Sequence, residues 1–232
     1  MHRRERADQT VGRVGPSKRR ARATPSALGR HGREAAHRER LIAVVTATPW
    51  LMRALEAVRA AGPADAWIGA GAVRGTVWDC IHGYSGASPS GDVDVVYFDA
   101  GDTSSQADVA YERRLSQQEP SLHWEVVNQA GVHLWYEETF GQRVPALASL
   151  KEGIGSWPET ATAVAVRLGA GSTVEVLAPL GLDDLFECVV RRNPARATVA
   201  MFRARVVAKR YTQRWPRVRV VWEQRSGDRT RR

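Results

Sequence analysis

The stretch that decides the fold is DVDVVYF, residues 92–98. Its β-branched and aromatic residues are typical of a strand. In a strand, residues i and i+2 project from the same face, about 6.6 Å apart along the chain. We therefore expect Asp92 and Asp94 to share one face, and Val93 and Val95 to point to the opposite, buried face.

Two carboxylates on one face repel each other, and a divalent cation relieves that repulsion. Mg²⁺ binds such oxygen ligands together with the phosphates of a substrate. The alternative is a solvent-facing strand whose two aspartates have no ligand, but the apolar run 95–98 favours an interior strand. The pattern therefore indicates a candidate metal site at Asp92 and Asp94.

The segment just before this strand, IGAGAVR (residues 68–74), predicts a strand, a turn of small residues and the start of a helix. In such a turn, here Gly69, Ala70 and Gly71, backbone N–H groups and a helix N-terminus can approach a phosphate closely. Arg74 lies in the first turn of the expected helix and could add a charge-assisted contact. The alternative is that the small residues only pack the helix on a sheet.

The remaining pattern predicts one mixed α and β domain without an internal repeat. Helices are expected as two pieces between residues 38 and 61, and over 73–82, 104–117, 182–190 and 199–214. Strands are expected over 67–70, 123–129, 160–167 and 173–177, the last two as a hairpin, and a loop over 82–91.

Charge is distributed unevenly along the 232 residues. Residues 1–40 hold 12 basic and 4 acidic side chains, a net charge of +8, and residues 203–232 hold 11 and 2, a net charge of +9. The body between them carries −8. We interpret residues 1–40 as a disordered basic tail, 41–220 as the folded domain, and 221–232 as a basic C-terminal tail. Either tail could contact nucleic acid weakly through phosphates, with a steep salt dependence.

Composition excludes several classes of protein. The longest apolar run, 41–52, is far shorter than the roughly 20 residues that span a membrane. Two cysteines, Cys80 and Cys188, are too few for a disulfide framework or an all-cysteine zinc site. No secretory signal pattern is visible at the N-terminus. We expect idle thiols, a cytoplasmic location and no membrane partner.

Five blocks carry a resemblance to a known family. They are WIGAGAVRGTVWD (67–79), DVDVVYFD (92–99), HWEVVNQAGVHLW (123–135), WPETATAVAVRL (157–168) and APLGLDDLF (178–186). In this order they resemble a bacterial branch of the nucleotidyltransferase superfamily with the DNA polymerase beta fold. The resemblance covers roughly residues 45–220. It implies an α+β fold with a small mixed sheet and flanking helices.

The resemblance also implies an activity, the Mg²⁺- or Mn²⁺-dependent transfer of a nucleotidyl group from an NTP to a hydroxyl acceptor. Asp92 and Asp94 match the paired metal-binding aspartates of the superfamily. Glu125 in HWEVVNQ matches a third carboxylate on a neighbouring strand. The turn of Gly69, Ala70 and Gly71 matches the glycine-containing turn that faces the triphosphate, and Arg74 would grip a phosphate oxygen.

Two other functions stay open at this point. One is a catalytically silent module of the same fold that binds nucleotide or nucleic acid, and the other is a component of a toxin–antitoxin pair. Retention of all three carboxylates favours an enzyme.

Three further features of the sequence lie outside the proposed site. Asp79 falls at the end of its expected helix, where a negative charge opposes the helix dipole. The pair Asp183 and Asp184 is interpreted as a helix cap, with a second functional pair as the alternative. The basic residues of 203–214 are interpreted as the solvated face of an amphipathic helix, which could also hold a phosphate near the acidic site.

Overall fold

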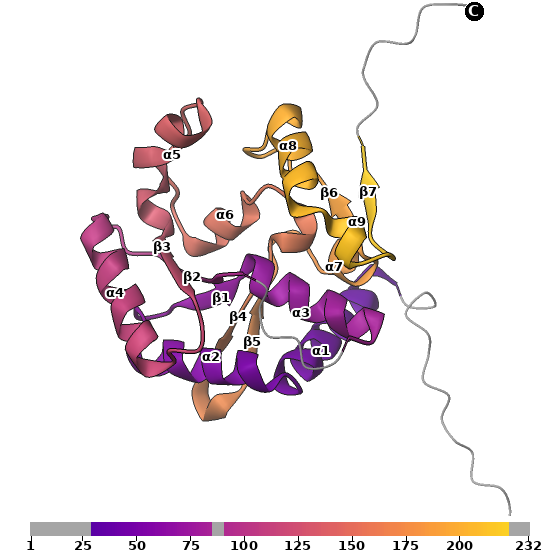
Figure 1. Ribbon diagram of the computed structural model, residues 1–232, viewed down its shortest axis with the longest axis horizontal. Coiled ribbons are helices and arrows are strands. Elements are labelled where there is room, and N and C mark those ends of the chain that lie inside the picture. The colour runs from indigo at the N-terminus through magenta and orange to yellow at the C-terminus, as the bar shows by residue number, and fades with distance from the viewer. Residues whose placement is uncertain (1–28, 85–90, 223–232) are drawn as a thin grey trace, which may run out of the picture.

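A mixed five-stranded sheet forms the centre of the computed structural model, which describes residues 29–84 and 91–222 (Figure 1). The strands lie in the order β3-β2-β1-β4-β5. Their bounds are Trp67–Gly69 (β1), Val93–Tyr97 (β2), Trp124–Asn128 (β3), Ala165–Leu168 (β4) and Val174–Leu177 (β5). Strands β2 and β3 are parallel and joined by helix α4 (Ser105–Gln118), and the other neighbours pair antiparallel.

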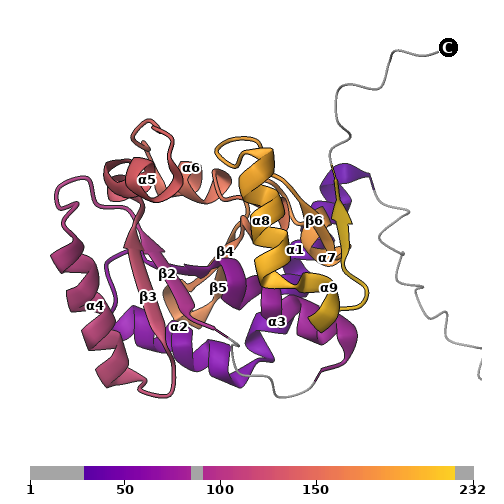
Figure 2. The same cartoon turned by 45° about the horizontal axis from the view of Figure 1, so that its top comes forward.

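Helices cover both faces of this sheet, as Figure 2 shows. Helices α2 and α4 lie on one side of it, and α5, α6 and α8 lie on the other. The remaining helical bounds are Arg30–Thr46 (α1), Pro49–Ala61 (α2), Ala70–His82 (α3), Val132–Phe140 (α5), Leu150–Gly155 (α6), Asp183–Phe186 (α7), Val199–Lys209 (α8) and Tyr211–Arg214 (α9). The architecture confirms the expected small mixed sheet with flanking helices.

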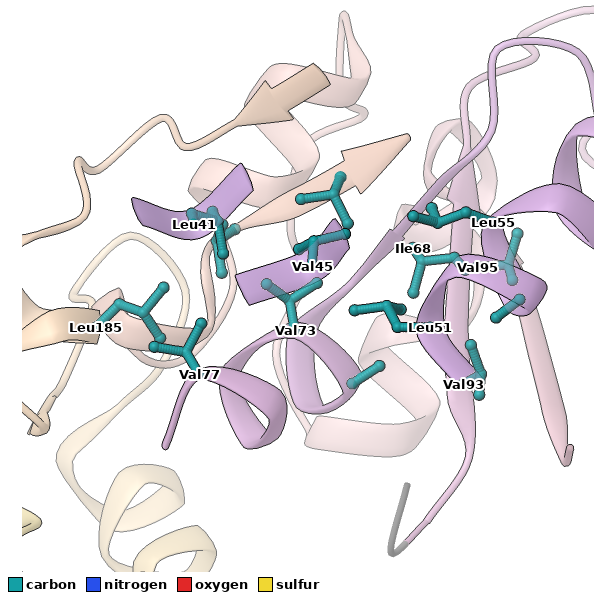
Figure 3. Packing of buried hydrophobic residues seen from close by; sticks show 14 of the residues in the cluster. Leu41, Val45, Leu51, Leu55, Ile68, Val73, Val77, Val93, Val95 and Leu185 are labelled. Carbon is teal, nitrogen blue, oxygen red and sulfur yellow. The ribbon is translucent and has the colours of Figure 1, made fainter. Parts of the chain in front are cut away.

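The main core lies between the sheet and helices α1 to α3 (Figure 3). Val93 and Val95 are fully buried there, on the face opposite Asp94, as the alternation in DVDVVYF predicts. Full burial of one such side chain contributes about 1.5–3 kcal/mol. The resulting register sets Asp94 of β2 beside Glu125 of β3.

The N-terminal boundary of the fold differs from the expectation. Helix α1 begins at Arg30, so the prediction of a disordered tail up to residue 40 is wrong for residues 30–40. Leu41 and Val45 of this helix are fully buried in the core, which stabilises the preceding polar turns as helix. Residues 1–28, most of the loop predicted over 82–91, and residues 223–232 of the predicted C-terminal tail lie outside the described residues.

The C-terminal third departs from the predicted elements at two places. The helix expected over 182–190 ends at Phe186, and Val189–Arg191 is a strand, β6, that pairs in parallel with β7 (Arg219–Val221). The helix expected over 199–214 is broken between α8 and α9 by Arg210, whose φ is +48°. Left-handed backbone ends a helix, and Cys188 adopts it as well, with φ +55°.

Strand β4 begins at Ala165, later than the strand predicted from residue 160, because Thr160–Thr162 forms a 3₁₀ turn. The β4–β5 hairpin itself is confirmed.

Within the described ranges, no single helix has the length and apolarity to cross a membrane. Helices α1 and α2 reach that length only as a pair, and they are bent by 90°.

Candidate functional site

A cleft of about 350 Å³ opens where the first turns of α3 meet strand β2 and the C-terminal helices. One side, which we call the acidic floor, consists of Asp92, Asp94 and Glu125. The opposite side, which we call the basic wall, is the segment α8–α9 and Trp215, from which Lys209 and Arg214 line the cleft. The cleft brings the three carboxylates predicted from the sequence to one place.

Strand geometry positions the acidic floor. Asp94 lies within β2, and Oδ2 of its carboxylate accepts a hydrogen bond from the Gly71 backbone N–H at 3.2 Å. Glu125 occupies the adjacent position on the parallel strand β3 and is exposed. Asp92 precedes β2 and is also exposed. The floor is thus built by the two strands that α4 joins.

The electrostatics of the floor follow from this proximity. Burial raises the pKa of Asp94, while the Gly71 hydrogen bond and the positive charges of Lys209, Arg205 and Arg74 oppose the rise. Partial desolvation and then the charges of Asp94 and Asp92 raise the pKa of Glu125. The carboxylates repel one another, and cations on the wall attract them.

The donor chemistry of the floor fits a divalent cation, because carboxylate oxygens are the ligands that Mg²⁺ prefers and a cation would relieve the repulsion that raises the pKa of Glu125. No group of three or more His, Cys, Asp or Glu side chains is gathered closely enough to hold a metal among residues 29–84 and 91–222. Asp92, Asp94 and Glu125 would therefore have to adjust their side chains around an ion.

The turn of small residues lies partly in the cleft. Gly71 lines the cleft, and its amide is already bound to Asp94. Gly69 is buried, and a side chain there would come within 2.6 Å of the Trp157 ring. Ala70 donates its amide to the Val164 carbonyl at 3.2 Å. The lack of a side chain at Gly69 thus accommodates Trp157, and only Gly71 borders the cleft.

Arg74 is buried in an aromatic cage. Its guanidinium carbon lies 4.8 Å from the ring centre of Tyr211, 5.1 Å from that of Trp78 and 5.6 Å from that of Trp215. An Arg74 Nη1 donates to the Tyr211 hydroxyl at 3.3 Å, whereas Arg74 Nε has no hydrogen-bond partner. Arg74 is 6% exposed, and it lines the cleft and supplies positive charge there.

Glu159 is a buried carboxylate that the sequence analysis did not identify. It binds residues of both α8 and α9. Its Oε1 accepts hydrogen bonds from Arg205 Nε and from the Tyr211 hydroxyl, each at 2.8 Å. Thr162 donates to its Oε2 at 3.1 Å. Glu159 is 1% exposed, so it ties the basic wall to the segment before β4. In the sequence, Glu159 differs from other glutamates only by its place in WPETAT, next to β-forming residues.

Asp79 has a structural role at the other end of the wall. Its Oδ1 accepts from Trp215 Nε1 at 2.7 Å, and its Oδ2 accepts from an Arg214 Nη2 at 3.0 Å. These bonds explain a carboxylate at the end of α3 and fix α9 against that helix.

The pair Asp183 and Asp184 lies at the start of α7, as expected for a helix cap, but its side chains have other partners. Asp184 forms hydrogen bonds with Arg191 and Thr160, and Asp183 lies 3.2 Å from His37 Nδ1.

Two comparisons with known proteins find relatives of the chain. A family model described as nucleotidyltransferase matches residues 56–220. An NMR structure described as revealing a CCA-adding enzyme head domain is similar, with a TM-score of 0.66 and 26% sequence identity over 80% of this chain and 96% of that chain. No curated protein matches the chain. Because the family model covers well over half of the sequence, including the acidic floor, the chain belongs to the nucleotidyltransferase family.

Proposed function

We propose that the protein is a metal-dependent nucleotidyltransferase that transfers a nucleotidyl group from an NTP to a hydroxyl acceptor. The observation that carries the proposal is the acidic floor, in which Asp94 and Glu125 are neighbours on parallel strands and Asp92 lies two residues away in the same cleft. Family membership supports the reaction class.

In this reaction, the acceptor oxygen forms a bond to the α-phosphorus, and the bond from that phosphorus to pyrophosphate breaks. Mg²⁺ or Mn²⁺, when bound, would neutralise charge on the phosphates and on the attacking oxygen. Asp92, Asp94 and Glu125 would be its ligands. Glu125, which lies beside Asp94 and lines the same cleft, would also accept the proton of the acceptor hydroxyl.

The remaining predicted residues would support the nucleotide in different ways. Gly71 borders the cleft without a side chain, so phosphate can approach the start of α3 closely. Gly69 and Ala70 shape the turn that presents Gly71. Arg74, held in its aromatic cage at the lining of the cleft, is proposed to attract phosphate through its charge.

Nucleotide binding measured by calorimetry tests this proposal. Each of the four NTPs is titrated with Mg²⁺, with Mn²⁺ or with chelator into the wild type, Asp94→Asn and Asp65→Asn. Asp65 is a matched control because it is an exposed aspartate that pairs with Arg167 and does not line the cleft. We expect metal-dependent binding that Asp94→Asn weakens and Asp65→Asn preserves.

The titrations are followed by incubation with an α-labelled NTP and candidate acceptors, with release of pyrophosphate as the second readout. Binding that is indifferent to both metal and Asp94 would contradict the proposal. It would favour the silent binding module, since the wall would then bind phosphates without the floor.

A further inference from the structure

The charges that line the cleft are separated, although opposite charges face each other across it. Lys209 lines the cleft with both carboxylates, and its positive charge opposes the rise in the pKa values of Asp94 and Glu125. Yet it forms no ion pair or hydrogen bond with any residue in the described parts of the chain. The cleft that these groups line has a volume of about 350 Å³.

The other two cations that line the cleft are already engaged. Arg74 is held by three aromatic rings and the Tyr211 hydroxyl. Arg214 is paired with Asp79 at 3.0 Å. Among the described residues lining the cleft, Lys209 is the cation with the freedom to make a new short contact with an anion, since a lysine ammonium offers three rotatable donors.

The position of Lys209 depends on a buried anchor one turn earlier in the same helix. Arg205 and Lys209 are four residues apart and therefore lie on the same side of α8. Arg205 is held by the buried Glu159, which also binds the Tyr211 hydroxyl in the following helix. The Glu159 carboxylate thus fixes the helical turn before Lys209 and the one after it.

We propose that Lys209 contacts the phosphates of the bound nucleotide, and that Glu159 is the positioning residue that holds α8 so that Lys209 faces the acidic floor. The inference rests on the proposed function and deepens it, because it names the group that recognises the triphosphate. A metal–polyphosphate ligand carries both charges that the cleft separates: the cation would meet the floor and the phosphates would meet Lys209.

Direct binding tests the role of Lys209 without relying on turnover. Inorganic tripolyphosphate and an NTP, both with Mg²⁺, and the corresponding nucleoside are titrated into the wild type, Lys209→Gln, Lys209→Arg and Arg203→Gln. Arg203 is the matched control, an exposed cation on the same helix that does not line the cleft. We expect Lys209→Gln to weaken tripolyphosphate and NTP binding by about tenfold or more, since a charge-assisted hydrogen bond is lost.

The controls separate this role from helix stability and from general charge. Nucleoside binding and the melting temperature should not change in Lys209→Gln, and Lys209→Arg should restore most of the affinity. Equal losses in Lys209→Gln and Arg203→Gln would overturn the proposal in favour of unspecific attraction. Wild-type binding that Lys209→Gln leaves unchanged would also overturn it, whereas absence of binding in the wild type would instead refute the proposed function.

A double-mutant cycle tests the role of Glu159. Glu159→Gln removes the charge that holds Arg205. Arg205→Lys keeps the positive charge but replaces the guanidinium that Glu159 binds, and it serves if Glu159→Gln does not fold. If Glu159 acts through Lys209, either variant should weaken tripolyphosphate binding in the wild type but have little further effect in Lys209→Gln. Additive losses would overturn the positioning role.

Discussion

The acidic floor and the basic wall form one cleft, but they are held in place by different interactions. The floor belongs to the acidic body of the chain and is fixed by backbone register, since β2 and β3 place Asp94 beside Glu125. The wall comes from the basic C-terminal part and is fixed by side chains, through Glu159 with Arg205 and Asp79 with Arg214. Substitutions can therefore disturb the chemistry of the floor without moving it, whereas the wall depends on a few buried polar atoms.

The largest expected effect comes from removing charge on the floor. Asp94→Asn should lower the rate of nucleotidyl transfer by about a thousandfold or more, because metal coordination supplies several kcal/mol of charge stabilisation in the transition state. The amide oxygen can still accept from Gly71, so the melting temperature and circular dichroism should stay close to those of the wild type. Full activity in Asp94→Asn or in Asp92→Asn would refute the assignment of the floor.

The next effect tests the attachment of the wall. Asp79→Ala leaves the Trp215 indole N–H buried without its acceptor and removes a charge partner of Arg214. We expect the free energy of unfolding to fall by about 2 kcal/mol, measured by urea denaturation. Asp79→Asn keeps an oxygen acceptor and should cost less. If neither variant is less stable than the wild type, α9 is held by other contacts.

The pH dependence of metal binding should distinguish the floor from ordinary surface carboxylates. The pKa values of Asp94 and Glu125 are both raised, so these groups take up protons at a higher pH than free carboxylates. A metal competes with those protons, so Mg²⁺ affinity should fall as the pH drops, by up to about tenfold per pH unit for each proton displaced. Calorimetry between pH 7 and pH 5 measures this. The Mg²⁺ affinity of Glu125→Gln should depend less steeply on pH. A wild-type affinity that does not change with pH would contradict the prediction.

The smallest expected effect is on the stability of the fold, which the negative charge of the floor lowers. A carboxyl group whose pKa is raised by folding favours the folded state below its unfolded pKa, and this contribution is lost as the pH rises through the folded pKa. At pH 7 the charge of Glu125 is therefore unfavourable. Glu125→Gln should raise the melting temperature by about 1 °C at pH 7, and the gain should vanish near pH 3. A lower melting temperature at pH 7 would contradict this electrostatic account.

The same contrast explains which parts could be predicted from the sequence. The floor is encoded locally: the alternation of Asp92 to Val95 indicates the strand, the face and the carboxylates together, and α4 joins two adjacent parallel strands in the usual way. Resemblance supplied Glu125, whose partner on β2 lies 31 positions earlier. The core and the sheet were predictable because burial imposes a period on the sequence.

The wall could not be predicted in the same way, because its contacts join distant residues. Glu159 has no periodic signature, and its burial depends on Arg205, 46 residues later. The run Val189–Arg191 is equally compatible with helix and strand, and its pairing with β7, 30 residues later, decides between them. The aromatic cage of Arg74 could not be predicted either, because its side chains come from α3, α9 and the residue that follows α9.

The two-stranded sheet β6–β7 has a consequence for the order of folding during synthesis. Strand β7 ends at Val221, and its partner β6 precedes the whole of the wall. All residues of the floor have been translated once β3 is complete. Strand β7, which pairs with β6, is complete only after nearly a hundred further residues. A nascent chain would therefore contain every residue of the floor before it contains those of the wall, and a chain that terminates before α8 would lack the anion-binding side altogether.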